Sequence, residues 1–79
     1  MIDKMELIRH VGVLETNRTG WTKELNIIDW GSGAVYDIRS WSPEHEKCGK
    51  GVTLSANGLQ ELMDYIKDEI ERGDDLSHA

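Results

Sequence analysis

The chain has 79 residues and a net charge of −6, with 38% hydrophobic and 30% charged residues, as expected for one small soluble domain. Its single cysteine, Cys48, excludes a disulfide within the chain, and no apolar run approaches the roughly 18 residues of a membrane span. The first residues are acidic where a signal peptide is basic, so we expect a cytoplasmic protein. Because so short a chain buries little surface, we also expect a homodimer.

The negative charge is concentrated in the last third of the chain. Residues 1–54 contain seven basic and eight acidic side chains, whereas residues 55–79 contain two basic and seven acidic ones. The total argues against nucleic-acid binding, which normally needs a basic surface. The nearly neutral first part can still form a locally positive face, and it contains all three tryptophans, Trp21, Trp30 and Trp41.

The first part of the chain predicts strands. Residues 7–15, 21–30 and 34–42 contain β-branched and aromatic residues without a helical period. The polar segment 16–20 and the Gly-Ser-Gly at 31–33 predict the turns between them. Residues 43–50 predict a polar loop with one helical turn beginning at Pro43, and residues 52–54 a short fourth strand.

A C-terminal helix is predicted from Ser55, a favourable N-cap, to about residue 72. Gly73 ends this helix, and residues 74–79 form a frayed acidic tail. The helix carries one apolar stripe, formed by Leu59, Leu62, Met63, Ile66 and Ile70. The prediction is one α+β domain over residues 1–73, a four-stranded antiparallel meander followed by one helix.

Strand alternation divides the sheet residues between two faces. If the helix covers the face of Leu25 and Ile27, the opposite face stays uncovered, with Asn26, Ile28, Trp30, Arg39 and Trp41. Flat rings that stack on bases, together with cations that follow phosphates, are typical of single-stranded nucleic-acid binding. Alternatively, the tryptophans fill a core or a dimer interface. Alternation places Lys23 on the covered face, unless a bulge turns it or it snorkels at the edge.

Other motifs carry less weight. The segment Gly49-Lys50-Gly51 resembles a phosphate cradle but lacks the P-loop spacing, so a plain turn is favoured. His45 and Cys48 are three residues apart, without the further ligands of a zinc site or the orienting group of a nucleophile. We therefore expect no metal, no cofactor and no enzymatic activity.

Three segments resemble a known family: GWTKELN at 20–26, YDIRSWSPEHEK at 36–47 and GKGVTLS at 49–55. They are similar to the bacterial YdbC-type proteins of the family of the transcriptional coactivator positive cofactor four. The resemblance implies a β-β-β-β-α homodimer that binds single-stranded DNA with little sequence preference. It implies that Lys23 and Asn26 contact the sugar-phosphate backbone of the DNA. It also implies that bases stack on Trp30 and that Arg39 contacts a phosphate. Trp41 lies one residue from the family's aromatic position, and Lys47 and Lys50 lie in its basic loop.

The expected nucleic-acid-binding residues are therefore Trp21, Lys23, Asn26, Trp30, Arg39, Trp41, Lys47 and Lys50. Trp21 and Ile28 stand where eukaryotic members tend to be basic, so we expect weaker phosphate attraction and a shallow salt dependence. Two alternatives remain open. One is a protein-interaction module that uses the tryptophan face or a sheet edge. The other is a binder of single-stranded RNA.

Overall fold

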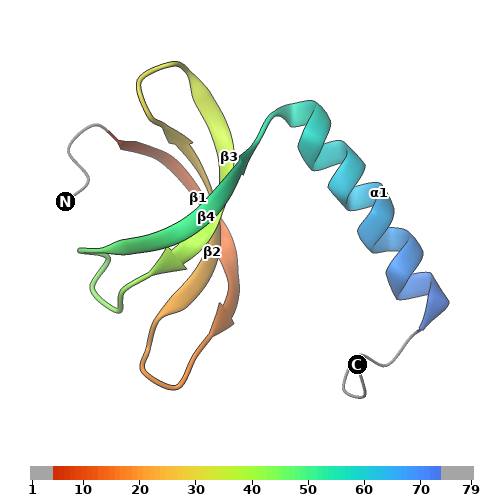
Figure 1. Ribbon diagram of the computed structural model, residues 1–79, viewed down its shortest axis with the longest axis horizontal. Coiled ribbons are helices and arrows are strands. Elements are labelled where there is room, and N and C mark those ends of the chain that lie inside the picture. The colour runs from red at the N-terminus through yellow and green to blue at the C-terminus, as the bar shows by residue number, and fades with distance from the viewer. Residues whose placement is uncertain (1–4, 74–79) are drawn as a thin grey trace.

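The computed structural model describes residues 5–73, and the predicted acidic tail at 74–79 lies outside them. The elements in chain order are β1 (Glu6–Thr16), β2 (Thr22–Asp29), β3 (Ala34–Trp41), β4 (Cys48–Leu54) and α1 (Ala56–Arg72) (Figure 1). The strands form one antiparallel sheet in the order β1-β2-β3-β4. The predicted α+β meander with one C-terminal helix is confirmed.

The turn between β2 and β3 follows from its residues. The carboxylate of Asp29 accepts hydrogen bonds from the backbone N–H groups of Gly31 and Gly33 at 2.7 and 3.1 Å. Both glycines have φ values above +110°, which side-chain-bearing residues rarely adopt. The β2–β3 register then continues without a bulge from Asp29 opposite Ala34 to Thr22 opposite Trp41.

β1 is irregular, and its irregularity shapes the sheet. Its register against β2 shifts three times, between Leu7 and Arg9, between His10 and Gly12, and between Val13 and Glu15. Each bulge bends a strand and increases its twist. β1 therefore bends over one face of the sheet. On that face, His10 lies opposite Asn26 and is hydrogen-bonded to it.

This face is the buried one, and we call it the inner face. It carries Glu24, Asn26 and Ile28 from β2 and Val35, Asp37, Arg39 and Trp41 from β3. The expectation that it stays uncovered is wrong: Asn26 and Ile28 are fully buried and Trp41 is 1% exposed. The sheet curls over its own inner face. The outer face carries Lys23, Leu25, Ile27, Tyr36, Ile38 and Ser40.

β4 begins four residues earlier than predicted. Cys48 already pairs with Trp41, and Gly51 pairs with Arg39. The segment Gly49-Lys50-Gly51 therefore lies inside a strand, and neither the predicted loop nor a turn into the strand describes it. The remaining loop, residues 42–47, carries a hydrogen-bonded turn from Ser42 O to His45 N instead of a helical turn at Pro43.

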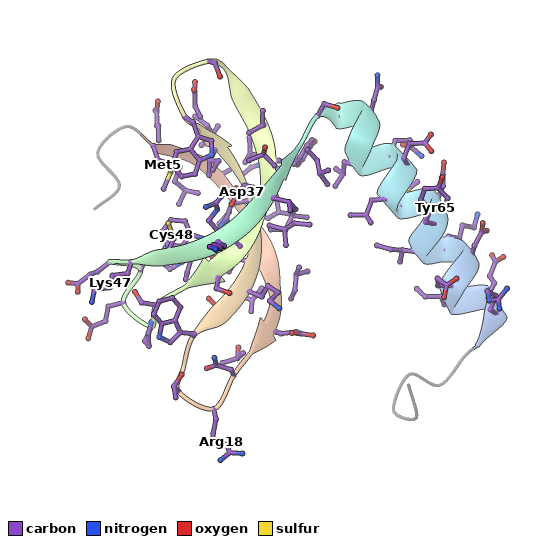
Figure 2. All side chains as sticks on the ribbon, in the orientation of Figure 1. Met5, Arg18, Asp37, Lys47, Cys48 and Tyr65 are labelled. Carbon is purple, nitrogen blue, oxygen red and sulfur yellow. The ribbon has the colours of Figure 1, made fainter. Side chains whose placement is uncertain are left out.

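The predicted helix and both of its ends are confirmed. The Ser55 side chain accepts a hydrogen bond from the N–H of Gly58, and Gly73 adopts the left-handed conformation that ends α1. However, the helix does not cover the sheet: none of its residues is buried, and Tyr65 lies well away from the strands (Figure 2). Only Ser55 separates β4 from α1, and the helix runs away from the sheet at the end of β4 (Figure 1). Within residues 5–73, no helix is long and apolar enough to span a membrane.

Candidate nucleic-acid interface

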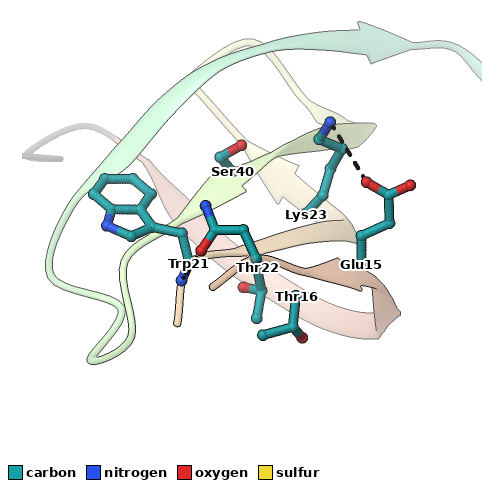
Figure 3. Close-up of a pocket in the computed structure, with 7 residues that line it drawn as sticks. Glu15, Thr16, Trp21, Thr22, Lys23 and Ser40 are labelled. Carbon is teal, nitrogen blue, oxygen red and sulfur yellow. Dashed lines mark hydrogen bonds and ion pairs between the residues drawn. The ribbon is translucent and has the colours of Figure 1, made fainter. Parts of the chain in front are cut away.

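Trp21 lies at one end of the sheet, between two open hollows. The first hollow, of about 500 Å³, is lined by Trp21 together with Lys23 and Ser40 from the outer face and with residues of the β1–β2 turn (Figure 3). The second, of about 280 Å³, is lined by Trp21 and by five residues of the β3–β4 loop, Ser42, Pro43, Glu44, Glu46 and Lys47. One half-buried indole therefore borders both hollows, and each hollow has one lysine.

Lys23 lies on the outer face, opposite Ser40, as strand alternation predicts. No bulge re-aims it, and its side chain is half exposed. Its ammonium lies 3.8 Å from a carboxylate oxygen of Glu15, an exposed pair that contributes little to stability (Figure 3). Lys23 is therefore accessible in the first hollow and separate from the inner face.

Trp30 and Arg39 form a second group. The Arg39 guanidinium lies 5.0 Å from the centre of the Trp30 ring, within the range of a cation–π contact. The same guanidinium donates to both carboxylate oxygens of Asp37 at 2.8 to 2.9 Å and to the carbonyl of Gly49 at 3.2 Å. The hydrogen bonds that Arg39 donates to Asp37 raise the pKa of Arg39 further, and the fully buried carboxylate neutralises its charge. Arg39 is therefore a fixed group beside Trp30.

Trp41 is covered instead of open. The imidazole of His45, in the β3–β4 loop, stacks on its ring with centroids 4.3 Å apart and planes inclined by 4°. The Nε2 of His45 also donates to the two oxygens of Glu24 at 3.0 and 2.9 Å. The loop is thereby held down on the inner face.

Glu24 is the centre of a buried polar network. Thr22 Oγ1 donates to Oε2 of Glu24 at 2.6 Å, and Asn26 Nδ2 donates to Oε1 at 3.2 Å. His10 Nδ1 in turn donates to Oδ1 of Asn26 at 2.7 Å. Burial opposes ionisation of Glu24, but the hydrogen bonds from Thr22, His45 and Asn26 and the charge of His45 outweigh it. The pKa of Glu24 is therefore lowered from its ordinary value of 4.5.

Because of this network, we expect the free energy of unfolding to depend on pH. Because the pKa of Glu24 is lower in the folded protein than in the unfolded chain, its stabilising contribution is complete above about pH 4.5 and is lost as the pH falls through the lowered value. Urea unfolding between about pH 6 and pH 3 is expected to give falling free energies of unfolding. In Glu24→Gln this fall is expected to be shallower, and parallel curves for the two proteins would contradict the prediction.

The structure divides the predicted residues. Trp21, Lys23 and Lys47 surround the two hollows, whereas Asn26, Trp41 and Arg39 belong to the inner face. Lys47 lies at the end of the β3–β4 loop (Figure 2), and Lys50 is exposed on β4. The predicted residues therefore do not form one continuous surface.

The other motifs have structural explanations. His45 bonds to Glu24, and Cys48 is a free thiol paired through the backbone with Trp41. Among residues 5–73, no group of three His, Cys, Asp or Glu side chains could hold a metal ion. Gly51 lies directly opposite Arg39, where a side chain would collide with β3.

Sequence reasoning missed the roles of Glu24, His45, Asp37 and His10. One signal was available: polar side chains recur at every second residue in Thr22-x-Glu24-x-Asn26 and in Asp37-x-Arg39. On one face of a strand, such a series indicates a hydrogen-bonded network.

Taken together, the fold and site define a small α+β protein whose curled sheet encloses a polar network beneath a tryptophan. The sequence matches no protein-family model. It is 45% identical over 62 residues to an uncharacterized protein of Treponema pallidum (strain Nichols), and the match covers 77% of this chain and 73% of that protein. The chain belongs to the same family as this Treponema protein.

Proposed function

We propose that the protein binds single-stranded DNA with little sequence preference and has no catalytic role. The observation that carries this proposal is the position of Trp21 between two open hollows, each of which has a lysine, Lys23 in one and Lys47 in the other. A ring accessible from two sides can stack on bases, and the lysines can follow the phosphates.

The charges around the hollows support weak attraction to phosphate. Glu15 pairs with Lys23, and Glu44 and Glu46 line the second hollow beside Lys47. Stacking on Trp21, and on Trp30 beside Arg39, then supplies most of the affinity. This is the balance expected because Trp21 and Ile28 stand where the eukaryotic members of the positive-cofactor-four family tend to be basic. We propose membership of that family, with a cytoplasmic role in transcription or DNA maintenance.

We propose further that the active form is a homodimer. The apolar stripe of α1 is unburied, with Met63, Ile66 and Ile70 at 52, 47 and 74% exposed. Val52, beside the apolar side chains of the outer face, is 56% exposed. A second copy that covers both surfaces would supply the buried apolar area that a chain of this length lacks.

The test is fluorescence anisotropy of a labelled thymidine oligonucleotide of about 20 nucleotides, with a duplex of equal length for comparison. We expect preferential binding of the single strand by a protein of dimer mass in sedimentation. Trp21→Ala is expected to weaken binding about tenfold, since one stacked base contributes roughly 1–3 kcal/mol. Tyr65→Ala, which removes an exposed ring on α1 far from both hollows, is the matched control.

Absence of single-strand binding at low salt, or an equal loss in both variants, would contradict the proposal. An RNA oligonucleotide of the same length is the third ligand. Tighter binding of RNA than of DNA would reassign the natural ligand, because the DNA assignment depends on the family resemblance.

A protein-interaction function is the second candidate, and β1 favours it. This edge strand exposes five large apolar side chains, Leu7, Ile8, Val11, Val13 and Leu14. Apolar docking on such an edge changes little with salt, whereas strand binding weakens as salt rises. Salt titration of any complex therefore separates the two candidates.

A further inference from the structure

His45 makes two contacts that a bound nucleobase makes. Its ring stacks nearly parallel on Trp41, with 4° between the planes, and its edge nitrogen donates to the carboxylate of Glu24. Proteins that read unpaired bases combine an aromatic surface for the face of the base with a hydrogen-bonding group for its edge. Trp41 and Glu24 form this combination, and an imidazole fills it.

The carboxylate of Glu24 has one acceptor site more than His45 can use. Its two oxygens offer about four acceptor sites. Thr22 takes one on Oε2 and Asn26 one on Oε1, which leaves one on each oxygen. The single Nε2–H of His45 is shared between these two, at 2.9 and 3.0 Å. A ring with two adjacent N–H donors would satisfy both.

The closed arrangement also has costs. His45 has φ +62°, in the left-handed region that is unfavourable for residues other than glycine. Among residues 5–73, no acceptor lies within hydrogen-bonding distance of the buried indole nitrogen of Trp41. The His45 side chain is 40% exposed, in a loop whose residues 43–47 are all exposed. A ligand therefore reaches the stack from solvent, and its release of His45 removes backbone strain.

We propose that Trp41 and Glu24 form a subsite for one guanine base and that His45 occupies this subsite until the base displaces it. This inference rests on the proposed binding of single-stranded DNA and adds a preference at one position of the bound strand. Guanine carries adjacent N1–H and N2–H donors, which match the two free acceptor sites. Thymine has one N–H between two carbonyls that a carboxylate repels, and adenine and cytosine each offer only an amino group.

The test compares three thymidine oligonucleotides of about 20 nucleotides that differ only at the central base: guanine, hypoxanthine or thymine. Hypoxanthine keeps the N1–H of guanine and lacks its amino group. With the unmodified protein, guanine is expected to bind about tenfold more tightly than hypoxanthine. Equal affinities for guanine and hypoxanthine would overturn the subsite, even with all three oligonucleotides bound and the proposed function intact.

Protein variants test whether His45 blocks the subsite. His45→Gly removes the ring and relieves the strained backbone, so affinity for the guanine oligonucleotide is expected to rise severalfold. His10→Ala is the matched control, because it also removes a histidine beside Glu24 but leaves the stack on Trp41 in place. An equal change in both variants would overturn the role of His45. Failure of the unmodified protein and of His45→Gly to bind any oligonucleotide would overturn both the subsite and the proposed function.

Discussion

Replacement of Gly51 by alanine is expected to lower the free energy of unfolding by about 3 kcal/mol or more. A Cβ atom at Gly51 would overlap the Cβ of Arg39 and the carbonyl oxygen of Ile38, and it would lie 2.8 Å from the Cα of Arg39. These neighbours are mostly backbone atoms of β3, which cannot move aside without opening the β3–β4 ladder. Urea unfolding followed by circular dichroism, at fixed protein concentration, measures the loss.

Gly49→Ala is the matched control, two residues away in the same strand. Its added Cβ would lie 3.6 Å from the Cβ of Ser40, an ordinary van der Waals contact. We therefore expect a change below about 1 kcal/mol. Similar losses for the two variants would contradict the steric explanation for Gly51.

Asp37→Asn is expected to lower the free energy of unfolding by about 3 kcal/mol, close to the cost of breaking a buried ion pair from one side. The carboxylate of Asp37 is fully buried and accepts hydrogen bonds from the guanidinium of Arg39 on both oxygens. The amide keeps one acceptor and leaves the Arg39 charge uncompensated. For a chain of this length, such a loss is a large share of the total stability.

Asp29→Asn makes the same chemical change at a turn. An amide oxygen there can still accept the hydrogen bonds from Gly31 and Gly33, so the expected loss is below about 1 kcal/mol. The same urea titration compares the two variants. If Asp37→Asn were as stable as Asp29→Asn, Arg39 would have to reach water or another acceptor when its partner loses charge.

Local signals predict the element order well. The β2–β3 hairpin follows from residues whose side chains and φ angles determine a turn, and Ser55 and Gly73 cap α1 where the sequence predicts. Strand alternation also sorts β2 and β3 correctly, including Lys23 on the face opposite Asn26. β4 was predicted too short because glycines usually mark loops, whereas Gly51 makes room for Arg39 across the ladder.

Which face is buried could not be predicted, because it depends on contacts between distant residues. The bulges of β1 arise from its pairing with β2. Among residues 7–15, Gly12 is the one residue of a type that often marks a bulge, and it lies at the second of the three register shifts. They bring His10 to Asn26, sixteen residues away in sequence, while the stack of His45 on Trp41 depends on how the 42–47 loop folds. The polar character of the inner face was readable, but its burial was not.

The register shifts of β1, which recur every three residues, also protect the sheet against edge-to-edge aggregation. β1 is an edge strand with many exposed apolar side chains, a combination that normally templates strand-by-strand aggregation. Its register shifts recur at intervals of three residues, so its peptide groups do not repeat with the two-residue period of a flat strand. A regular strand from another molecule could form hydrogen bonds with only a short stretch of this edge. Beyond it, the N–H and C=O groups of the two strands would no longer lie opposite one another. β1 can therefore expose apolar side chains without providing a continuous edge to which further strands could add to form a fibril.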